Sequence, residues 1–365
     1  MPNVKKFMVS GGGTGGHIFP ALAIANELKA TYPNCEIEFV GAQGRMEMER
    51  IPREGYTIHG LPIVGLNRQS MAANLKFPVK LIRSIAHCRK ILKSFQPDVV
   101  IGTGGFASGP LLYVAQLMGI PTVIQEQNSY AGITNKRLGA KAKAICVAYE
   151  GMHQFFPKEK VHLTGNPVRP AILNSNTSAE ESKREFGLDL NKPTLLVLGG
   201  SLGARRINEA IESLIDWAKE KDVQILWQCG KLYYEALETK LGNHPGVFLH
   251  AFISDMNKAY ACADIILSRA GAGTISELAI IGKPTILIPS PNVAEDHQTK
   301  NALALVEKKA ALLIRESEID SRLEADLERL LQDEPRRKSL SEALLKLAIP
   351  DATQRIVKLI EPLIK

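Results

Sequence analysis

Short apolar runs alternate with amphipathic helical patterns along both halves of the chain. In the first half, apolar runs at 7–9, 37–40, 99–101 and 122–124 alternate with helical patterns such as 21–30 and 111–118. The second half repeats this order, with apolar runs at 194–198, 224–227, 247–250, 265–268 and 285–288. Alternation of this kind is typical of parallel strands joined by covering helices. The pattern therefore predicts an α/β protein with two doubly wound parallel-sheet domains.

The boundary between these domains is predicted where the composition changes. Residues 174–185 are polar, charged and poor in large apolar side chains, so the crossing is expected between 165 and 192. We place an N-terminal domain at 1–166 and a C-terminal domain at 167–349, with a cleft between them. The last amphipathic segment, about 350–365, could pack on either domain, including back on the first.

The composition is that of an ordinary globular protein. The 365 residues include 45 Lys and Arg against 38 Asp and Glu, a net charge of +7, and 45% of positions are hydrophobic. These values exclude a disordered chain, a collagen-like repeat and a minimal disulfide scaffold. The five cysteines lie far apart and form no Cys-x-x-Cys pair, which favours reduced thiols and a cytoplasmic protein.

Neither export nor a membrane span is predicted. The first ten residues hold only a short apolar stretch before a run of glycines, so they lack a signal-peptide hydrophobic region. The longest stretch without a charged residue, 99–125, is interrupted by glycines and prolines. It is therefore interpreted as strand, loop, helix and strand.

One segment of the chain has a net charge of +7, equal to the net charge of the whole protein. Residues 55–97 contain no Asp or Glu and seven Lys or Arg. One face of a predicted helix there holds Lys80, Arg83, His87 and Lys90, and the opposite face holds Leu81, Ile82, Ile85, Cys88 and Leu92. Apolar residues also alternate with cations near its start. The candidate membrane contacts are Leu75, Lys76, Phe77, Val79, Lys80 and Arg83.

Two interpretations of this basic segment remain open. It is either a helix with a solvated basic face or a surface that contacts anionic lipid. Nucleic acid is not favoured as a partner, because the segment lacks stacking aromatic residues and no nucleic-acid-binding motif occurs elsewhere.

Three glycine-rich loops, at 11–16, 102–109 and 199–203, each follow an apolar strand and precede a helical pattern. Such loops point backbone amides at an anion near a helix N-terminus. We expect the first of these helices to begin near Pro20. Gly11, Gly13 and Gly16 match the dinucleotide fingerprint, but no acidic residue ends the second strand, so an NAD-dependent oxidoreductase is not favoured.

The stretch from Ser268 to Glu277 is the most specific. A strand leads into a turn of small residues and then into a helix whose N-terminus is suited to a diphosphate. Glu277 could accept hydrogen bonds from both hydroxyls of a ribose. The competing interpretation is an acid in the first helical turn, stabilised by the helix dipole.

Several motifs, in the same order along nearly the whole chain, resemble those of one enzyme family. They are Gly13-Thr14-Gly15-Gly16-His17, Gly104–Pro110, Glu126-Gln127-Asn128, Gly165–Arg169, Gly199–Arg205 and the block Ser268–Asn301. On these motifs the chain is similar to the peptidoglycan N-acetylglucosaminyltransferases. The resemblance implies the GT-B fold, with two Rossmann-like domains facing an interdomain cleft. It also implies an inverting transfer of GlcNAc from UDP-GlcNAc to the 4-hydroxyl of MurNAc in undecaprenyl-diphospho-MurNAc-pentapeptide, which converts lipid I to lipid II.

The resemblance also implies where the enzyme works. Its acceptor is anchored in the inner membrane, so a peripheral protein on the cytoplasmic face is expected, with the basic segment against anionic lipid. The activity belongs to peptidoglycan synthesis and therefore to cell shape and cell division.

Site residues are implied in the same way. Phe252 and Ile253 would lie against the uracil, and Glu277 would hold the ribose. The donor contacts implied are Thr14, Gly15, Gly16, Arg169, Ser201, Phe252, Ile253, Arg269, Gly271, Ala272, Gly273, Thr274, Glu277, His297 and Gln298. The acceptor contacts implied are Gly13, Gly104, Gly105, Ser108 and Asn128. Some relatives carry two glutamines in place of His297 and Gln298, which leaves the contacts to the sugar hydroxyls open.

Inversion requires a base for the acceptor hydroxyl and a group that stabilises the departing UDP. The sequence contains no Asp-x-Asp triplet, the signature of many metal-dependent sugar-nucleotide enzymes. We therefore expect backbone amides and Arg169 or Arg269 to stabilise the leaving group, with no metal and no cofactor. His17 is the first candidate for the base, although it could instead donate a hydrogen bond to the acceptor. Glu126 is the alternative base.

Two other functions remain in view. A UDP-GlcNAc 2-epimerase would use a similar cleft and the same donor, but it would need neither the acceptor loops nor the basic segment. A non-catalytic protein that binds a carrier lipid would explain the basic segment, but it would leave Glu277 and the donor turns without a purpose.

Overall fold

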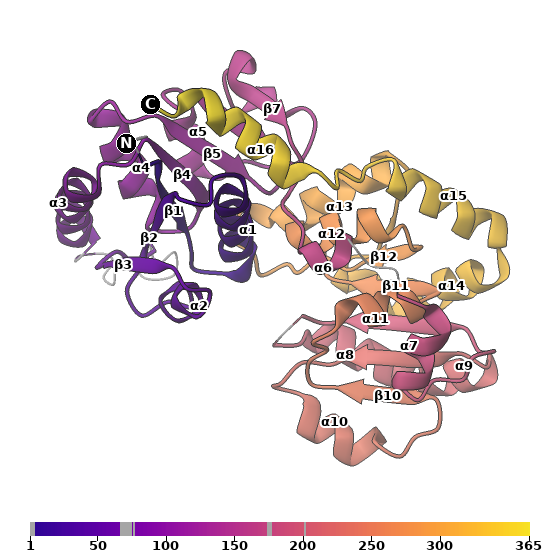
Figure 1. The fold of residues 1–365 in the computed structure, drawn as a ribbon. Helices are drawn as coiled ribbons and strands as arrows, with labels where there is room; N and C mark the ends of the chain where they lie inside the picture. Colours follow the sequence, from indigo (N-terminus) through magenta and orange to yellow (C-terminus); the bar gives the residue numbers. More distant parts are fainter. Residues whose placement is uncertain (1–3, 66–74, 76, 174–176, 201) are drawn as a thin grey trace. The chain divides into compact units, whose positions relative to one another are not determined.

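The computed structural model describes residues 4–65, 75, 77–173, 177–200 and 202–365. The chain divides into two compact units (Figure 1). The N-terminal unit consists of Met1–Val168 together with Ile349–Lys365, and the C-terminal unit consists of Arg169–Ala348. Two predicted site residues, Lys76 and Ser201, lie outside the described residues.

The N-terminal unit is a parallel sheet of seven strands covered by helices. Its strands, in the spatial order β3-β2-β1-β4-β5-β6-β7, are β1 (Lys6–Gly11), β2 (Glu36–Ala42), β3 (Thr57–Leu61), β4 (Val99–Gly104), β5 (Thr122–Glu126), β6 (Ala144–Val147) and β7 (Val161–Leu163). Its helices are α1 (Gly15–Thr31), α2 (Glu47–Arg53), α3 (Phe77–Phe95), α4 (Ser108–Leu117), α5 (Ile133–Gly139) and α16 (Ala352–Ile360), which packs on α1. Along β1, Phe7 and Val9 belong to one core cluster and Met8 to another, so both faces of the sheet are buried.

The C-terminal unit repeats this plan with six parallel strands. In the spatial order β10-β9-β8-β11-β12-β13, they are β8 (Thr194–Leu198), β9 (Gln224–Gln228), β10 (Val247–His250), β11 (Ile265–Ser268), β12 (Thr285–Leu287) and β13 (Leu312–Leu313). Its helices are α6 (Pro170–Leu173), α7 (Ala179–Glu185), α8 (Arg205–Ser213), α9 (Ile215–Glu220), α10 (Tyr234–Leu241), α11 (Met256–Cys262), α12 (Ala272–Ile281), α13 (His297–Glu307), α14 (Ile319–Gln332) and α15 (Glu334–Leu345). Every residue of β8, β9 and β11 is buried, as expected for central strands covered on both faces.

The prediction of two doubly wound parallel sheets is confirmed, but one helix start was predicted wrongly. Helix α1 begins at Gly15 rather than near Pro20, which lies inside the helix. The amides of His17 and Ile18 both donate to the Thr14 carbonyl, so glycines form the first turn. The low helix propensity of glycine concealed this start in the sequence.

The five cysteines are thiols inside the two units. All five cysteines are buried and free. Burial raises the pKa of Cys88 and of Cys146 to about 12, so both are protonated thiols at neutral pH. None of the helices in the described part of the chain combines the length and the apolar character needed to cross a bilayer.

Candidate active site

Both sheets place their glycine loops at the carboxyl edge, beside the point where the strand order reverses. In the N-terminal unit this point lies between β1 and β4, and in the C-terminal unit it lies between β8 and β11. Open parallel sheets bind ligands at such points because neighbouring connections diverge there. The candidate residues of each unit therefore gather where this fold is expected to bind ligands.

The ring of His17 is oriented by two acceptors in the N-terminal unit. Its Nδ1 lies 2.9 Å from the Thr103 carbonyl oxygen and 3.1 Å from Oε1 of Gln127. Because both partners accept, Nδ1 carries the proton and donates it, which leaves Nε2 unprotonated in the neutral ring. The half-buried side chain thus has one nitrogen held by the protein and one that can take a proton.

Gly104 provides the space that this ring needs. A Cβ atom at residue 104 would lie 2.7 Å from Nδ1 of His17, and the backbone has φ +108°. At Gly105, with φ +91°, a Cβ atom would lie 2.3 Å from the Gly12 carbonyl oxygen. Both positions therefore require glycine for conformation and for space. The loops after β1 and β4 are in direct contact.

Glu126 is buried and fully hydrogen-bonded. One carboxylate oxygen accepts from the Asn128 amide at 3.2 Å and from its Nδ2 at 3.4 Å. The other accepts from the Gly132 amide at 3.1 Å and from Nδ2 of Asn135 at 2.8 Å. These donors occupy both oxygens, so the observed role of Glu126 is to organise the loop after β5.

Sequence reasoning missed two residues that shape this part of the site. Glu47, only 1% exposed, accepts from the Gly13 amide at 2.8 Å and from the Ala42 amide at 3.0 Å. It holds the first glycine loop from a helix that no motif singled out. Gln127 lay inside a quoted motif, but nothing in the sequence indicated that its side chain would reach His17.

Two donors hold Glu277 in the C-terminal unit. Arg169 forms a bidentate pair with it, with Nε 2.7 Å from Oε1 and an Nη atom 2.8 Å from Oε2. The hydroxyl of Tyr260 donates to Oε2 at 3.1 Å. Because α12 begins at Ala272, Glu277 lies in its second turn, and the interpretation as a first-turn acid is wrong. Glu277 is thus part of a built polar cluster.

Tyr260 holds this cluster from the core. It is 1% exposed, and burial, followed by the Glu277 carboxylate, raises its pKa well above the ordinary value. The phenol therefore stays protonated and donates. For UDP-GlcNAc, the donor that the motif resemblance implies, we predict that Tyr260→Phe raises the KM about fivefold with kcat near the wild-type value, because one hydrogen bond of about 1 kcal/mol no longer orients Glu277. Steady-state kinetics measure this effect, and Tyr113→Phe, at an exposed tyrosine, is the control. A fall in kcat with an unchanged KM would contradict the prediction.

A pocket of about 340 Å³ lies beside this cluster. Its walls are Arg169, Ala171, Ile172, Ser254, Asp255, Met256 and Asn257. The predicted uracil contacts, Phe252 and Ile253, directly precede the lining residues 254–257 in the sequence. The side chain of Phe252 is 52% exposed, and that of Ile253 is buried. The Ile253 amide donates to Oε1 of Gln228 at 2.8 Å. The pocket is therefore lined by Arg169, the partner of Glu277, and by Ser254, the chain neighbour of Ile253.

The turn before α12 has the geometry of an anion site. Gly271 precedes the helix, no acid lies in its first turn, and a Cβ atom at Gly273 would meet nothing within 4 Å. Ala272 and Thr274 complete that turn. Open space at a helix N-terminus that lacks an acid is favourable for a phosphate group.

Arg269 does not extend toward this turn. Its guanidinium donates to the carbonyls of Ile288 at 3.2 Å and Pro289 at 3.1 Å and pairs with Glu316. The Arg269 side chain therefore fixes the backbone just after β12. Gln298 accepts from the Ser290 amide at 2.9 Å, which orients its side chain, and His297 begins α13.

The remaining predicted contacts lie in the N-terminal unit. Thr14, Gly15 and Gly16 form the start of α1, and Gly13 precedes them with φ +85°. Ser108 is buried at the start of α4. These positions share the carboxyl edge of that sheet with His17.

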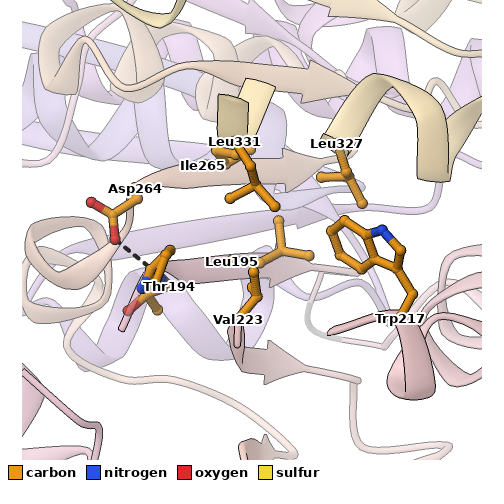
Figure 2. A pocket seen from close by; sticks show the side chains of 9 residues that line it. Thr194, Leu195, Trp217, Val223, Asp264, Ile265, Leu327 and Leu331 are labelled. Atoms are coloured by element: carbon orange, nitrogen blue, oxygen red, sulfur yellow. Dashed lines mark hydrogen bonds between the residues drawn. The ribbon is translucent and has the colours of Figure 1, made fainter. Parts of the chain in front are cut away.

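A second, smaller cavity lies away from these residues (Figure 2). It has a volume of about 10 Å³, near the lower limit for one water molecule. Thr194 and Ile265, which line it, are the first residues of β8 and β11, so the cavity lies at the amino edge of the sheet. Its position and size make it a packing defect rather than a ligand site. Among the residues that the structure describes, no group of three or more His, Cys, Asp or Glu side chains is placed to hold a metal.

Helix α3 and the preceding Leu75 form an apolar and basic surface, which we define as the exposed Leu75, Val79, Ile82 and Arg83 with the half-buried Lys80. Leu75 is 79% exposed, Val79 52% and Ile82 67%. Ile82 was assigned to the same apolar face as Leu81, but it lies about 100° around the helix from Leu81, and only Leu81 of this pair packs on the core. Phe77 is half-buried against the same core.

Known proteins resemble the chain over almost its full length. The N-terminal domain model of glycosyltransferase family 28 matches residues 7–147, and the C-terminal domain model matches residues 194–356. A Flavobacterium psychrophilum protein named UDP-N-acetylglucosamine–N-acetylmuramyl-(pentapeptide) pyrophosphoryl-undecaprenol N-acetylglucosamine transferase is 55% identical, and the match covers 98% of each chain. The structure of Acinetobacter baumannii MurG matches with a TM-score of 0.79 and 32% identity, covering 98% of this chain and 99% of that one.

A more distant structure shows the fold alone. The UDP-GlcNAc 2-epimerase of Neisseria meningitidis has a TM-score of 0.68 at 18% identity, covering 98% of this chain and 100% of that one. The GT-B architecture of two Rossmann-like domains is therefore shared with enzymes of different chemistry. Since both domain models match and a full-length relative is 55% identical, the chain belongs to glycosyltransferase family 28.

Proposed function

We propose that the protein is an inverting glycosyltransferase that moves GlcNAc from UDP-GlcNAc to the 4-hydroxyl of MurNAc in undecaprenyl-diphospho-MurNAc-pentapeptide. The observation that carries this proposal is the full-length identity of 55% to a relative whose name states that transfer. The residues of both units supply the groups that the reaction needs, and they act as follows.

The C-terminal unit binds the donor. The uracil lies against Phe252 and Ile253 beside the 340 Å³ pocket, and the ribose hydroxyls donate to Glu277. The diphosphate meets the amides of the Gly271–Thr274 turn, and we assign Ser201, which follows β8 in the sequence, to the same group. His297 and Gln298 contact the sugar hydroxyls. Negative charge that develops on the departing UDP is stabilised by oriented amides and by Arg169.

The N-terminal unit binds the acceptor and removes its proton. The amides near Gly13, Gly104 and Gly105 face the acceptor diphosphate, and Ser108 and Asn128 position its sugar. The 4-hydroxyl attacks C1 of GlcNAc while the bond from C1 to the UDP oxygen breaks, which inverts the anomeric centre. Nε2 of His17 accepts the hydroxyl proton. We assign the base to His17 rather than Glu126, since both oxygens of Glu126 already accept hydrogen bonds from its own loop.

The decisive assay combines purified protein, labelled UDP-GlcNAc and a lipid I analogue, with and without EDTA. We expect labelled lipid II in both conditions, because the leaving group is stabilised without a metal. Loss of product with EDTA and its recovery with magnesium or manganese would contradict metal independence. Release of ManNAc and UDP in the absence of an acceptor would identify a 2-epimerase instead.

The basic surface of α3 is proposed to dock the enzyme on the cytoplasmic face of the inner membrane. The acceptor is anchored there, and this surface presents apolar side chains beside cations in a segment without acidic residues. Anionic lipid attracts each nearby cation by about 1 kcal/mol, and exposed apolar side chains add to that attraction.

Charge reversal tests this docking. Replacing Lys76, Lys80 and Arg83 by Glu is expected to weaken binding to phosphatidylglycerol-containing vesicles by roughly a hundredfold, the loss of about 3 kcal/mol. Vesicle sedimentation at low and high salt measures it, because salt screens the attraction. The matched control reverses Lys219, Lys338 and Lys346 in the C-terminal unit. Unchanged vesicle binding by the α3 variant would place the docking site elsewhere.

A further inference from the structure

The guanidinium of Arg169 in the C-terminal unit lies at the pocket and also binds a carboxylate. Arg169 lines the 340 Å³ pocket, and it also forms the bidentate pair with Glu277 at 2.7 and 2.8 Å. The structure thus has Arg169 covering the carboxylate to which we assign the ribose. Arg169 and Tyr260 together donate three hydrogen bonds to Glu277, and a carboxylate has about four acceptor sites, so a ribose cannot donate both of its hydroxyls until Arg169 moves away.

The two members of this ion pair differ in their access to water. The Arg169 side chain is 44% exposed, whereas that of Glu277 is 12% exposed. Glu277 is also fixed by the buried Tyr260 hydroxyl at 3.1 Å, whereas Arg169 lines the pocket, where a bound ligand can replace Glu277 as its partner. When the pair separates, Arg169 is therefore the member that moves.

The hydrogen bonds to Glu277 raise the pKa of Arg169, which is in any case charged at every physiological pH. Separating the pair leaves one cation and one largely buried anion without their partners, which is unfavourable. Ribose hydroxyls can donate to Glu277 in place of Arg169. Arg169, once it has left Glu277, needs another anion as its acceptor, and phosphate oxygens fit the planar guanidinium.

We propose that Arg169 is a specificity-determining residue that makes ribose binding at Glu277 conditional on a diphosphate. This inference rests on the proposed function, because it uses the same donor site. A nucleoside must break the ion pair and leave Arg169 without a partner. A nucleoside diphosphate offers the guanidinium a phosphate in exchange and frees the carboxylate for the ribose. The free site therefore selects nucleotides that carry phosphates.

The proposal predicts that removing the Arg169 charge weakens the binding of UDP but does not weaken the binding of uridine. Isothermal titration calorimetry gives the dissociation constants of UDP and of uridine for the wild-type protein and for Arg169→Gln. We expect the variant to bind UDP roughly tenfold or more weakly, since a charged phosphate partner is lost. Uridine should bind as well as before or several-fold more tightly, since no ion pair has to be broken. The matched control is Arg206→Gln, at an exposed ion pair of α8, which should change neither constant.

Weakening of both ligands by the same factor, or an unchanged UDP affinity, would overturn the proposal. Arg169→Lys addresses a loss of folding in the first variant, because it keeps the charge but cannot bond both carboxylate oxygens. Its preference for UDP over uridine should fall between those of the wild type and Arg169→Gln, and a wild-type preference would also overturn the proposal. A wild-type protein that binds neither ligand would contradict the donor site itself, whereas UDP binding with parallel losses would contradict only the role of Arg169.

Discussion

Replacing His17 by Ala is expected to lower kcat by roughly a hundredfold or more, with little change in the KM for UDP-GlcNAc. Removing a positioned general base costs about this factor, since the acceptor hydroxyl then loses its proton only to water. The donor KM should change little because His17 belongs to the N-terminal unit, whereas the uracil and ribose contacts are assigned to residues of the C-terminal unit. Initial rates with a saturating lipid I analogue measure both constants.

Two further variants separate the base from a merely orienting role. His17→Asn keeps a donor for the Thr103 carbonyl but removes the proton acceptor, so the fall in kcat should persist. If His17 only orients the acceptor, the main effect would be a higher KM for lipid I. His153→Ala, at an exposed histidine of the same unit, should behave like the wild type. Near-normal turnover of His17→Ala would remove His17 from the role of base.

The second large effect is expected at Glu277, where Ala should raise the KM for UDP-GlcNAc by roughly a hundredfold. The carboxylate accepts from two ribose hydroxyls, and a hydrogen bond to a charged group contributes about 1.5–3 kcal/mol. Because these bonds form equally in the ground state and in the transition state, kcat should change far less. The variant also leaves the buried Tyr260 hydroxyl without its acceptor, so a loss of about 1–3 kcal/mol in unfolding free energy should accompany the kinetic effect.

A donor that lacks one ribose hydroxyl tests whether the KM effect of Glu277→Ala comes from ribose binding. With 2′-deoxy-UDP-GlcNAc, the wild-type enzyme should lose about tenfold in kcat/KM, whereas Glu277→Ala should lose almost nothing further. Equal losses for both proteins would show that Glu277 acts elsewhere. Glu180→Ala, at an exposed ion pair of α7, is the control for removing a carboxylate from the same unit.

Hydrophobic patterning predicted the two sheets because central parallel strands are buried on both faces. The central strands at 194–198 and 265–268 lie where the apolar runs placed them. The strands β3, β6, β7 and β13 were missed, since β3 and β7 are partly exposed edge strands, β6 has four residues and β13 has two, so each carries little periodic signal. Glycine motifs likewise located the loops, because only glycine allows the positive φ found at residues 13, 104 and 105.

The partners of the functional side chains could not be predicted in this way. Gln127 reaches His17 from 110 positions away, and Arg169 reaches Glu277 from 108. Neither spacing follows a helical or strand period, so no local pattern records it. Glu126 was kept as a candidate base and Arg269 as a phosphate contact because side-chain hydrogen bonds leave no pattern in the sequence, whereas in the structure Glu126 bonds its own loop and Arg269 bonds the end of β12.

The sequence by itself determined the fold class and the positions of the glycine loops, because these depend on short-range periodicity and on glycine. It also determined which side chains could act as bases, acids or hydrogen-bond donors, because that depends on residue type alone. Only the tertiary structure decided which of those side chains are held, covered or exposed. Those states depend on hydrogen bonds that no sequence pattern records. They join distant segments at His17 and at the pair of Arg169 with Glu277, and they lie within the folded loop after β5 at Glu126.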